Sequence, residues 1–293
     1  MRILHLTDTH LYGDDDSRHY GRIDTTAALN GLLARFTALR DIDAVVLTGD
    51  ASEDATAGSY QKLHAILDPF AEQLGAQLAV VMGNHDVSAH YAEVRCMGAR
   101  GTTVQDHVLD LPGGGRIVVL DLNVPGAGYG HLEAEQIQWL RDVLATPAAG
   151  DRGTVLAIHH PPLVAATAML QSLDLDELEV LAGVLEDTDV RIVLAGHYHH
   201  EMTSRIGAVP VHVAPGITNV VDPITAGERE GSLALSGASI IELAGTADPA
   251  HDAAPRVFTS VFPNAGDPLA DPTVPVYDFG PAEIRAIQEH AGR

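Results

Sequence analysis

Short, strongly apolar runs alternate along the chain with longer segments whose apolar residues recur at helical spacing. The runs lack polar alternation, which is typical of strands buried on both faces of a sheet. They cover residues 2–7, 43–48, 77–82, 154–158 and 190–195. Leu29, Leu32 and Phe36 mark one face of a predicted helix. A second helix is expected over 59–74, and Pro69 should break it.

The second half of the chain favours antiparallel pairing. Two apolar segments, 107–111 and 116–122, flank the turn residues Pro-Gly-Gly-Gly and predict a β-hairpin. Further strands are expected at 202–206, 209–214, 238–243 and 256–262, and further helices at 89–97, 133–144, 176–187 and 281–290. Because βα units precede the hairpins, we expect an α/β fold of two packed sheets with helices outside.

The chain is expected to form one domain over residues 1–262, followed by a tail over 263–293. Its 293 residues, 46% of them hydrophobic, suffice for one large core, and no internal repeat or clear linker interrupts it. The tail is rich in Pro, Asp and Gly and has no predicted strand. We expect it to pack on the domain or on a partner subunit through Val276, Tyr277 and Phe279, and the alternative is disorder, which its Pro and Asp content favours.

Charge and cysteine content narrow the function classes. The formal net charge is −23 and Lys62 is the only lysine, so binding to nucleic acid or to an anionic membrane is not expected. No apolar run approaches the roughly 20 residues that span a bilayer, and no signal peptide is evident. Cys96 is the only cysteine, so no disulfide can form within the chain and the cytoplasm is favoured. Cys96 itself is expected to be a small buried residue.

Polar side chains follow all five of the apolar runs. Each alone has an ordinary interpretation as a cap, a turn residue or a hydrogen-bonded core histidine. The carboxyl ends of strands in open α/β sheets are where ligands bind, so together they predict one site. The residues are Asp8 and His10, Asp50, Asn84 to Asp86, His159 and His160, and His197 to His200.

Their types and spacing predict metal binding. In a strand, residues i and i+2 face the same side, so Asp8 should converge with His10 and His197 with His199, whereas His160 and His200 should point elsewhere. The expected ligands are Asp8, His10, Asp50, Asn84, His159, His197 and His199. Mixed carboxylate, amide and imidazole donors suit Mn, Fe, Zn or Co. Seven ligands exceed the needs of one ion and predict two ions roughly 3.5–4 Å apart, with Asp50 shared.

The five blocks, in this order from residue 8 to residue 199, resemble the calcineurin-like metallophosphoesterase superfamily. The stretches VMGNHD, HHPP and LAGHYHH are most similar to its bacterial class III cyclic-nucleotide phosphodiesterases. The resemblance implies a four-layer α-β-β-α sandwich of two mixed sheets flanked by helices, and a homodimer. It implies one ion held by Asp8, His10, Asp50 and His199 and a second held by Asp50, Asn84, His159 and His197.

The resemblance also implies that His85 is a catalytic histidine and not a metal ligand. We therefore expect hydrolysis of a small phosphodiester, such as 3′,5′-cyclic AMP, by a hydroxide bridging two transition-metal ions, with Fe and Mn favoured and Zn or Co as alternatives. Asn84, His85 and His199 should contact the substrate. Asp86 should either orient an imidazole or lie at a helix N-terminus. Segment 11–22 is a candidate rim of the pocket.

Three rival interpretations remain open on the sequence. The same site would serve a glycerophosphodiesterase or a phosphomonoesterase of nucleotides or phosphoproteins. A nuclease on the same fold is disfavoured by the negative charge. A non-catalytic scaffold would require missing ligands, and none is missing.

Overall fold

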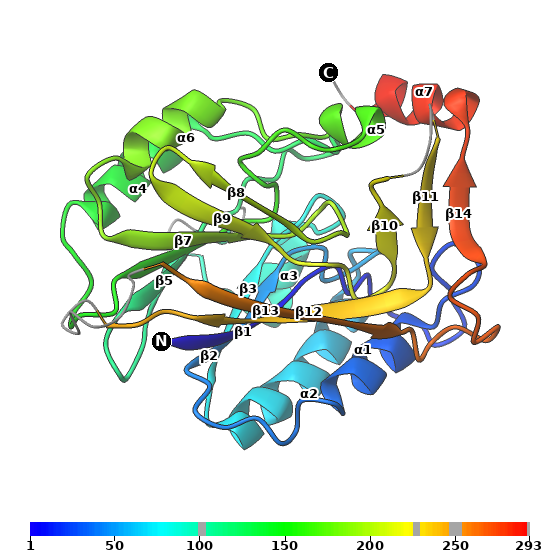
Figure 1. Ribbon diagram of the computed structural model, residues 1–293, viewed down its shortest axis with the longest axis horizontal. Coiled ribbons are helices and arrows are strands. Elements are labelled where there is room, and N and C mark those ends of the chain that lie inside the picture. Colours follow the sequence, from blue (N-terminus) through cyan, green and yellow to red (C-terminus); the bar gives the residue numbers. More distant parts are fainter. Residues whose placement is uncertain (99–103, 225–228, 246–253, 292–293) are drawn as a thin grey trace.

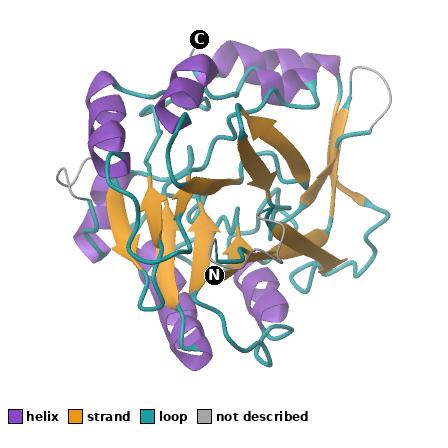
Figure 2. Cartoon of the chain, turned by 60° about the vertical axis from the view of Figure 1, so that its left-hand side comes forward, coloured by secondary structure: helices purple, strands orange, loops and turns teal. Residues whose placement is uncertain are grey.

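Two large sheets stack face to face, and helices cover their outer faces (Figures 1 and 2). This computed structural model describes residues 1–98, 104–224, 229–245 and 254–291. In Figure 1 the layers run from α1 and α2 at the bottom, through the two sheets, to α4 and α6 at the top. The arrangement confirms the predicted four-layer α-β-β-α sandwich.

The first sheet has five strands in the order β13-β12-β1-β2-β3. Its three adjacent N-terminal strands are parallel, and the other two pair antiparallel. The strands are β1 (Arg2–Leu6), β2 (Ala44–Thr48), β3 (Gln77–Val81), β12 (Leu235–Glu242) and β13 (Arg256–Pro263). Helices α1 (Thr25–Leu33), α2 (Ala57–Leu74) and α3 (Ser88–Val94) belong to this half.

The second sheet has six strands in the order β4-β5-β6-β7-β9-β8. The predicted hairpin is confirmed as the antiparallel pair β4 and β5, and β5, β6, β7 and β9 run parallel. The strands are β4 (His107–Asp110), β5 (Arg116–Val119), β6 (Thr154–Ala157), β7 (Val190–Ala195), β8 (Met202–Ile206) and β9 (Val209–Val213). Helices α4 (Ala134–Leu144) and α6 (Leu178–Leu185) cover its outer face.

A third, small sheet was not predicted. Its strand order is β10-β11-β14. The strands are β10 (Val220–Asp222), β11 (Glu230–Leu233) and β14 (Pro275–Phe279). It stands at the right of Figure 1, beside α5 (Ala168–Gln171) and α7 (Pro281–His290). The segment after Pro263, expected to be irregular apart from its helix, thus contributes a strand as well.

Alternate residues of the central strands pack into different cores, which fixes the strands in place. Ile3 of β1 points between the two sheets, whereas Leu4 and Leu6 pack toward the helices of the first layer. All three are fully buried. Burying a side chain of this size contributes about 1.5–3 kcal/mol. The parallel strands therefore end at fixed places along one edge.

Two local expectations were wrong. Helix α2 continues through Pro69, where a break was expected. Proline removes the hydrogen bond to the carbonyl four residues earlier, that of Ala65, and both residues are exposed, so water can replace the lost donor. Cys96 is exposed instead of buried. Among the described residues, no helix has the length and apolar character needed to cross a membrane.

Candidate metal centre

The loops after β1, β2, β3, β6 and β7 meet at one edge of the sandwich. The Asp8 backbone N–H donates to the Gly49 carbonyl at 3.1 Å, and the Gly196 N–H donates to the His159 carbonyl at 3.0 Å. The His197 N–H donates to Asp8 Oδ2 at 3.2 Å and so joins the two sheets. All seven predicted ligands are therefore delivered to one region.

Five of the seven ligands adopt left-handed backbone conformations. The φ angles are 57° at Asp8, 43° at His10, 48° at Asp50, 69° at His197 and 52° at His199. Asp and His accept this region more readily than most residues, yet it is sparsely populated. The expectation that strand alternation aligns these pairs was wrong, because β1 ends at Leu6 and β7 at Ala195. Left-handed turns beyond the strands aim the side chains instead.

Glycines let these loops approach one another closely. A Cβ at Gly83 would lie 2.2 Å from the backbone nitrogen of Asp50, and one at Gly196 would lie 1.8 Å from Thr7 Oγ1. Both distances are far inside van der Waals contact, so no larger residue fits without moving the strand ends.

The first ligand cluster contains Asp8, His10, Asp50 and His199, and one donor atom from each lies within 4.8 Å of the others. His199 Nε2 is 3.2 Å from Asp8 Oδ1, and His10 Nε2 is 3.6 Å from Asp50 Oδ2. The two Nε2 atoms face each other at 3.1 Å. The other ring nitrogens are engaged elsewhere: His10 Nδ1 with Glu53 Oε2 at 2.7 Å, and His199 Nδ1 with the Asn219 carbonyl at 3.2 Å.

The second cluster gathers around His159. Its Nε2 lies 3.1 Å from Asn84 Oδ1 and 3.4 Å from Asp50 Oδ2, while its Nδ1 donates to the Thr48 carbonyl at 2.7 Å. The ring of His197 is 5.0 Å from that of His159, centre to centre. His197 Nε2 donates to the Leu173 carbonyl at 3.1 Å, which leaves Nδ1 as the ring's free acceptor.

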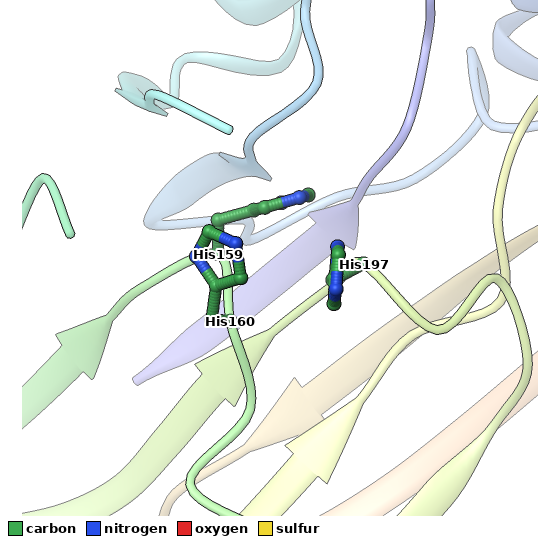
Figure 3. Close-up of side chains that lie close together, drawn as sticks. All are labelled: His159, His160 and His197. Atoms are coloured by element: carbon green, nitrogen blue, oxygen red, sulfur yellow. The ribbon is translucent and has the colours of Figure 1, made fainter. Parts of the chain in front are cut away.

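His160 also lies in this second cluster, which the sequence analysis did not expect. Its ring is 4.6 Å from that of His197, and Figure 3 shows the two beside His159. A donor atom of each of the three histidines lies within 4.8 Å of the others. His160 Nε2 meets the Gly128 carbonyl at 3.2 Å. His200 is buried, with its Nδ1 against the Glu201 carbonyl, and belongs to none of the donor clusters found among the described residues.

The donor set fits metal ions. Carbonyl oxygens accept the Nδ1 hydrogens of His159 and His199. When these rings are neutral, each Nε2 therefore carries a lone pair and no hydrogen. These lone pairs face carboxylate and amide oxygens that also only accept. Such a group of acceptors requires a cation or extra protons. Although burial favours neutral rings, Asp50 raises the pKa of His159 to about 9, and Asp8 likewise raises the pKa of His199. Metal ions can take the place of those protons.

Glu53 is a central residue of the site that the sequence analysis missed. Its Oε2 lies 2.7 Å from His10 Nδ1, 3.1 Å from His85 Nδ1 and 3.7 Å from His19 Nδ1. Burial opposes charge on this carboxyl, but the hydrogen bonds from His10 and His85 hold its pKa well below the ordinary value. Glu53 therefore fixes the tautomer of a ligand histidine and of His85. Its position three residues after Asp50, in the same strand-end loop, was the available signal.

His85 stands at the mouth of the site, outside both ligand clusters as far as the described residues show. Its side chain is 39% exposed, and its backbone N–H donates to Asp50 Oδ1 at 3.0 Å. Burial of the ring works against protonation, but Asp50 and Glu53 together raise the pKa of His85 to about 10. Because Nδ1 faces Glu53, Nε2 is the nitrogen available to a ligand.

Asp86 does not orient an imidazole, nor does it cap a helix. Its carboxylate accepts three backbone N–H bonds, from Gly83 at 2.8 Å, Ala51 at 3.0 Å and Ser52 at 2.9 Å. The N-cap of α3 is Val87, which has no side-chain bond. Burial, with the nearby charge of Asp50, raises the pKa of Asp86 to about 7. Asp86 thus ties the loop after β2 to the loop after β3.

A cavity of about 100 Å³ lies over both clusters. Ligand residues form its floor. The walls come from other segments: His19, Tyr20, Met169, Leu170, Leu173, Asn219, Val221 and Tyr277. Two of them, His19 and Tyr20, belong to the 11–22 segment predicted as a rim.

Known proteins resemble this chain in sequence and in fold. It is 38% identical over 244 residues to the cAMP/cGMP dual specificity phosphodiesterase MT0825 of Mycobacterium tuberculosis, covering 82% of this chain and 75% of that protein. It is 29% identical over 266 residues to the 3′,5′-cyclic adenosine monophosphate phosphodiesterase CpdA of Escherichia coli K12, covering 85% and 90%. The purple acid phosphatase PPD1 of yellow lupin superposes with a TM-score of 0.52 at 14% identity, covering 88% of this chain and 53% of that one.

A family model described as calcineurin-like phosphoesterase matches residues 1–201, which include all seven predicted ligands and His85. The match confirms the resemblance seen in the five sequence blocks. The chain belongs to the calcineurin-like phosphoesterase family.

Proposed function

We propose that this chain is a metal-dependent phosphodiesterase that hydrolyses cyclic nucleotides such as 3′,5′-cyclic AMP. The observation that carries the proposal is the complete set of seven side chains that can bind metal, gathered at one edge of the sandwich with His85 beside them. The names of the relatives support the substrate class: both sequence relatives described above are cyclic-nucleotide phosphodiesterases. A non-catalytic scaffold would be expected to lack some of the metal ligands, and this chain has all seven.

We assign one ion to Asp8, His10, Asp50 and His199, and the second to Asp50, Asn84, His159 and His197. When bound, two such ions supply positive charge for the phosphate oxygens and lower the pKa of a water that can act as nucleophile. Asp50 lies between the clusters, with Oδ2 near both His10 and His159. Asp50 is therefore the proposed shared ligand. The charge of the bound ions would let the chain hold an anionic substrate despite its negative net charge.

His85 is proposed to protonate the leaving oxygen. Glu53 accepts from Nδ1 at 3.1 Å, so the ring presents Nε2–H toward the cavity. Burial opposes a charged ring, but in the metal-free chain Asp50 and Glu53 raise the pKa of His85, and the Glu53 contact at Nδ1 favours the protonated form. A ribose alkoxide is a poor leaving group, and a positioned acid helps it by about 10²- to 10⁴-fold. Asn84, His85 and His199 all line the cavity and are the proposed contacts to the phosphate.

The test is a substrate panel with purified, metal-reconstituted protein. It includes 3′,5′-cyclic AMP and cyclic GMP, a glycerophosphodiester, nucleoside monophosphates and a phosphopeptide. We expect kcat/KM for a cyclic nucleotide to exceed that for the others by at least about tenfold, a difference of about 1.4 kcal/mol in the barrier. Preference for a glycerophosphodiester or a monoester would assign the site to that class. Absence of any hydrolysis with both ions present would support the scaffold.

The finer properties follow from the donor set and the family. We propose Fe and Mn as the native ions, with Zn or Co as substitutes, because imidazole and carboxylate donors suit all four and availability decides among them. We also propose a homodimer and a cytoplasmic location, the latter because a single cysteine permits no disulfide within the chain. Metal analysis of protein purified without added metal tests the identity of the ions. Light scattering tests the homodimer.

A further inference from the structure

A row of aromatic rings leads from the metal centre to the small third sheet. His10 stacks on His19 with ring centres 4.6 Å apart, and His19 meets Tyr20 edge-on at 4.4 Å. Tyr20 lies 4.7 Å from Tyr277 of β14, and Tyr277 stacks on Phe279 at 4.3 Å and 16°. The row therefore joins two segments more than two hundred residues apart in sequence, and both tyrosines line the cavity over the ligands.

The backbone holds Tyr20 in a conformation that tyrosine avoids. Tyr20 and Gly21 have φ angles of 50° and 66° and form a tight turn closed by the Arg22 N–H to the His19 carbonyl at 3.0 Å. Two consecutive residues with positive φ are usually Asn or Gly, and a bulky residue in this conformation is a strained outlier. The surrounding structure must impose this conformation. The conformation places the Tyr20 ring at the edge of the cavity over the predicted ligands.

Arg22 fixes this turn against the C-terminal segment. Its guanidinium donates to both oxygens of Asp267, at 2.8 and 2.7 Å, and to the carbonyls of Val274 and Pro275 at 2.9 and 2.8 Å. Its side chain is only 11% exposed. A bidentate, nearly buried ion pair has well-defined geometry. Tyr20 and Tyr277 are therefore held in a fixed relative position.

Tyr20 is nonetheless 49% exposed, an unusual state for an aromatic ring held so firmly. Tyr20 and Tyr277 both line the cavity over the predicted ligands. A phosphate held at the metal centre would therefore bring the organic part of its ester close to these rings. In this row one ring, that of His19, lies between the predicted ligand His10 and Tyr20, so Tyr20 stands close to the metal centre and is partly exposed beside it.

We propose that Tyr20, backed by Tyr277, is the stacking platform for the base of the cyclic nucleotide. The inference rests on the proposed function and adds a specificity-determining residue to it. Every base has a π-face, and stacking on an aromatic side chain changes affinity by roughly 5- to 100-fold. Tyr20 sets the affinity for the base, and the metal ligands and His85 carry the reaction.

The test compares two substrates that differ only in the base. One is 3′,5′-cyclic AMP, and the other is 1-deoxyribose 3′,5′-cyclic phosphate, in which hydrogen replaces the base. Tyr20→Asn removes the ring and suits the left-handed turn, so the fold should be kept or stabilised. Tyr20→Phe keeps the ring. Phe258→Leu, at an exposed aromatic of β13, is the matched control.

In the metal-loaded enzyme, Tyr20→Asn should raise KM for cyclic AMP by about tenfold with little change in kcat, as loss of stacking predicts. KM for the base-free substrate should change less than about twofold. Tyr20→Phe and Phe258→Leu should behave as wild type. Equilibrium binding of a slowly hydrolysed cyclic phosphorothioate should weaken in parallel. Tyr277→Leu should raise KM for cyclic AMP less than Tyr20→Asn does.

An unchanged KM for cyclic AMP in Tyr20→Asn would overturn this inference and leave the proposed function standing. An equal rise for both substrates would also overturn it, because the ring would then serve the phosphate. If wild type hydrolyses other diesters but no cyclic nucleotide, the proposed function fails and this inference fails with it.

Discussion

The Nε2 atoms of His10 and His199 face each other at 3.1 Å, and each ring has its other nitrogen engaged with an acceptor oxygen. Asp8 and Asp50 complete the same cluster. Two imidazole lone pairs do not approach this closely without a cation or a proton between them. The cluster therefore requires positive charge, which protons supply in the metal-free chain and metal ions can supply in their place.

Metal binding should release protons. Burial favours a neutral ring, but the carboxylates of Asp50 and Asp8 raise the pKa of His159 to about 9 in the metal-free chain. The ring thus carries a proton at pH 7, and an ion must displace it because only the lone pair coordinates. Ion binding should therefore weaken as the pH falls and strengthen as it rises toward 9. Titration calorimetry in buffers of different ionisation enthalpy should show about one proton or more released per chain at pH 7. Heats that do not depend on the buffer would contradict this.

Asp50→Ala should lose most of both ions, because Asp50 Oδ2 lies near a histidine of each cluster. Asn84→Ala should mainly weaken the second ion, since Asn84 Oδ1 contacts His159 at 3.1 Å. Elemental analysis after dialysis measures the ions retained. Asp142→Ala, on the exposed side of α4, is the control and should keep both ions. Two ions per chain retained in Asp50→Ala would disprove the shared ligand.

His85→Ala should lose about 10²- to 10⁴-fold in kcat on cyclic AMP, because a ribose alkoxide needs a proton as it leaves. The loss should be much smaller on bis(p-nitrophenyl) phosphate, since nitrophenolate leaves without one. Metal content should not change. Glu53→Gln should show a milder form of the same selectivity, because Glu53 holds His85 Nδ1.

The matched control for this comparison is His90→Ala, an exposed histidine of α3, which should keep both activities. Steady-state rates on both substrates, under conditions in which chemistry limits turnover, make the measurement. Equal losses on the two substrates in His85→Ala would show that the ring positions the phosphate instead of protonating the leaving group.

Asp86→Ala should destabilise the fold and not act through the leaving group. Three buried backbone N–H groups lose their acceptor, and each unsatisfied donor costs about 1–3 kcal/mol. We expect the free energy of unfolding in urea to fall by about 3 kcal/mol or more. Any loss of activity should be the same for cyclic AMP and the nitrophenyl diester. A loss confined to cyclic AMP, with stability unchanged, would return Asp86 to a role in orienting an imidazole.

The sequence predicted the sandwich and the residues of the site because both depend on local signals. Asp8, Asp50, Asn84, His159 and His197 each lie within two residues of the end of an apolar run, and the ends of parallel strands meet at one edge. The directions in which these side chains point were less predictable, because they depend on left-handed turns that the alternation of side chains along a strand does not describe.

The remaining features depend on contacts between distant segments. The place of Glu53 in the loop after Asp50 marks it as a candidate, but Asp54 shares that loop and instead accepts the Gly13 N–H, so the sequence alone does not choose between them. The third sheet was missed because β10 and β11 are short and only weakly apolar, and because β14 pairs with β11 across a long stretch of chain. Arg22 similarly reads as an ordinary surface residue until residues 267–275 are placed beside it.

The two proposed ion positions would each take ligands from both halves of the sandwich. Asp8, His10, Asp50 and Asn84 follow strands of the first sheet, and His159, His197 and His199 follow strands of the second. A bound ion is therefore a cross-link between layers, and for His10 and His199 it closes a loop of 189 residues. Like a disulfide, it lets the folded chain persist, but it forms only when folding has brought its ends together and can be opened by a chelator. The lifetime of the folded enzyme is then governed by how fast its ions depart.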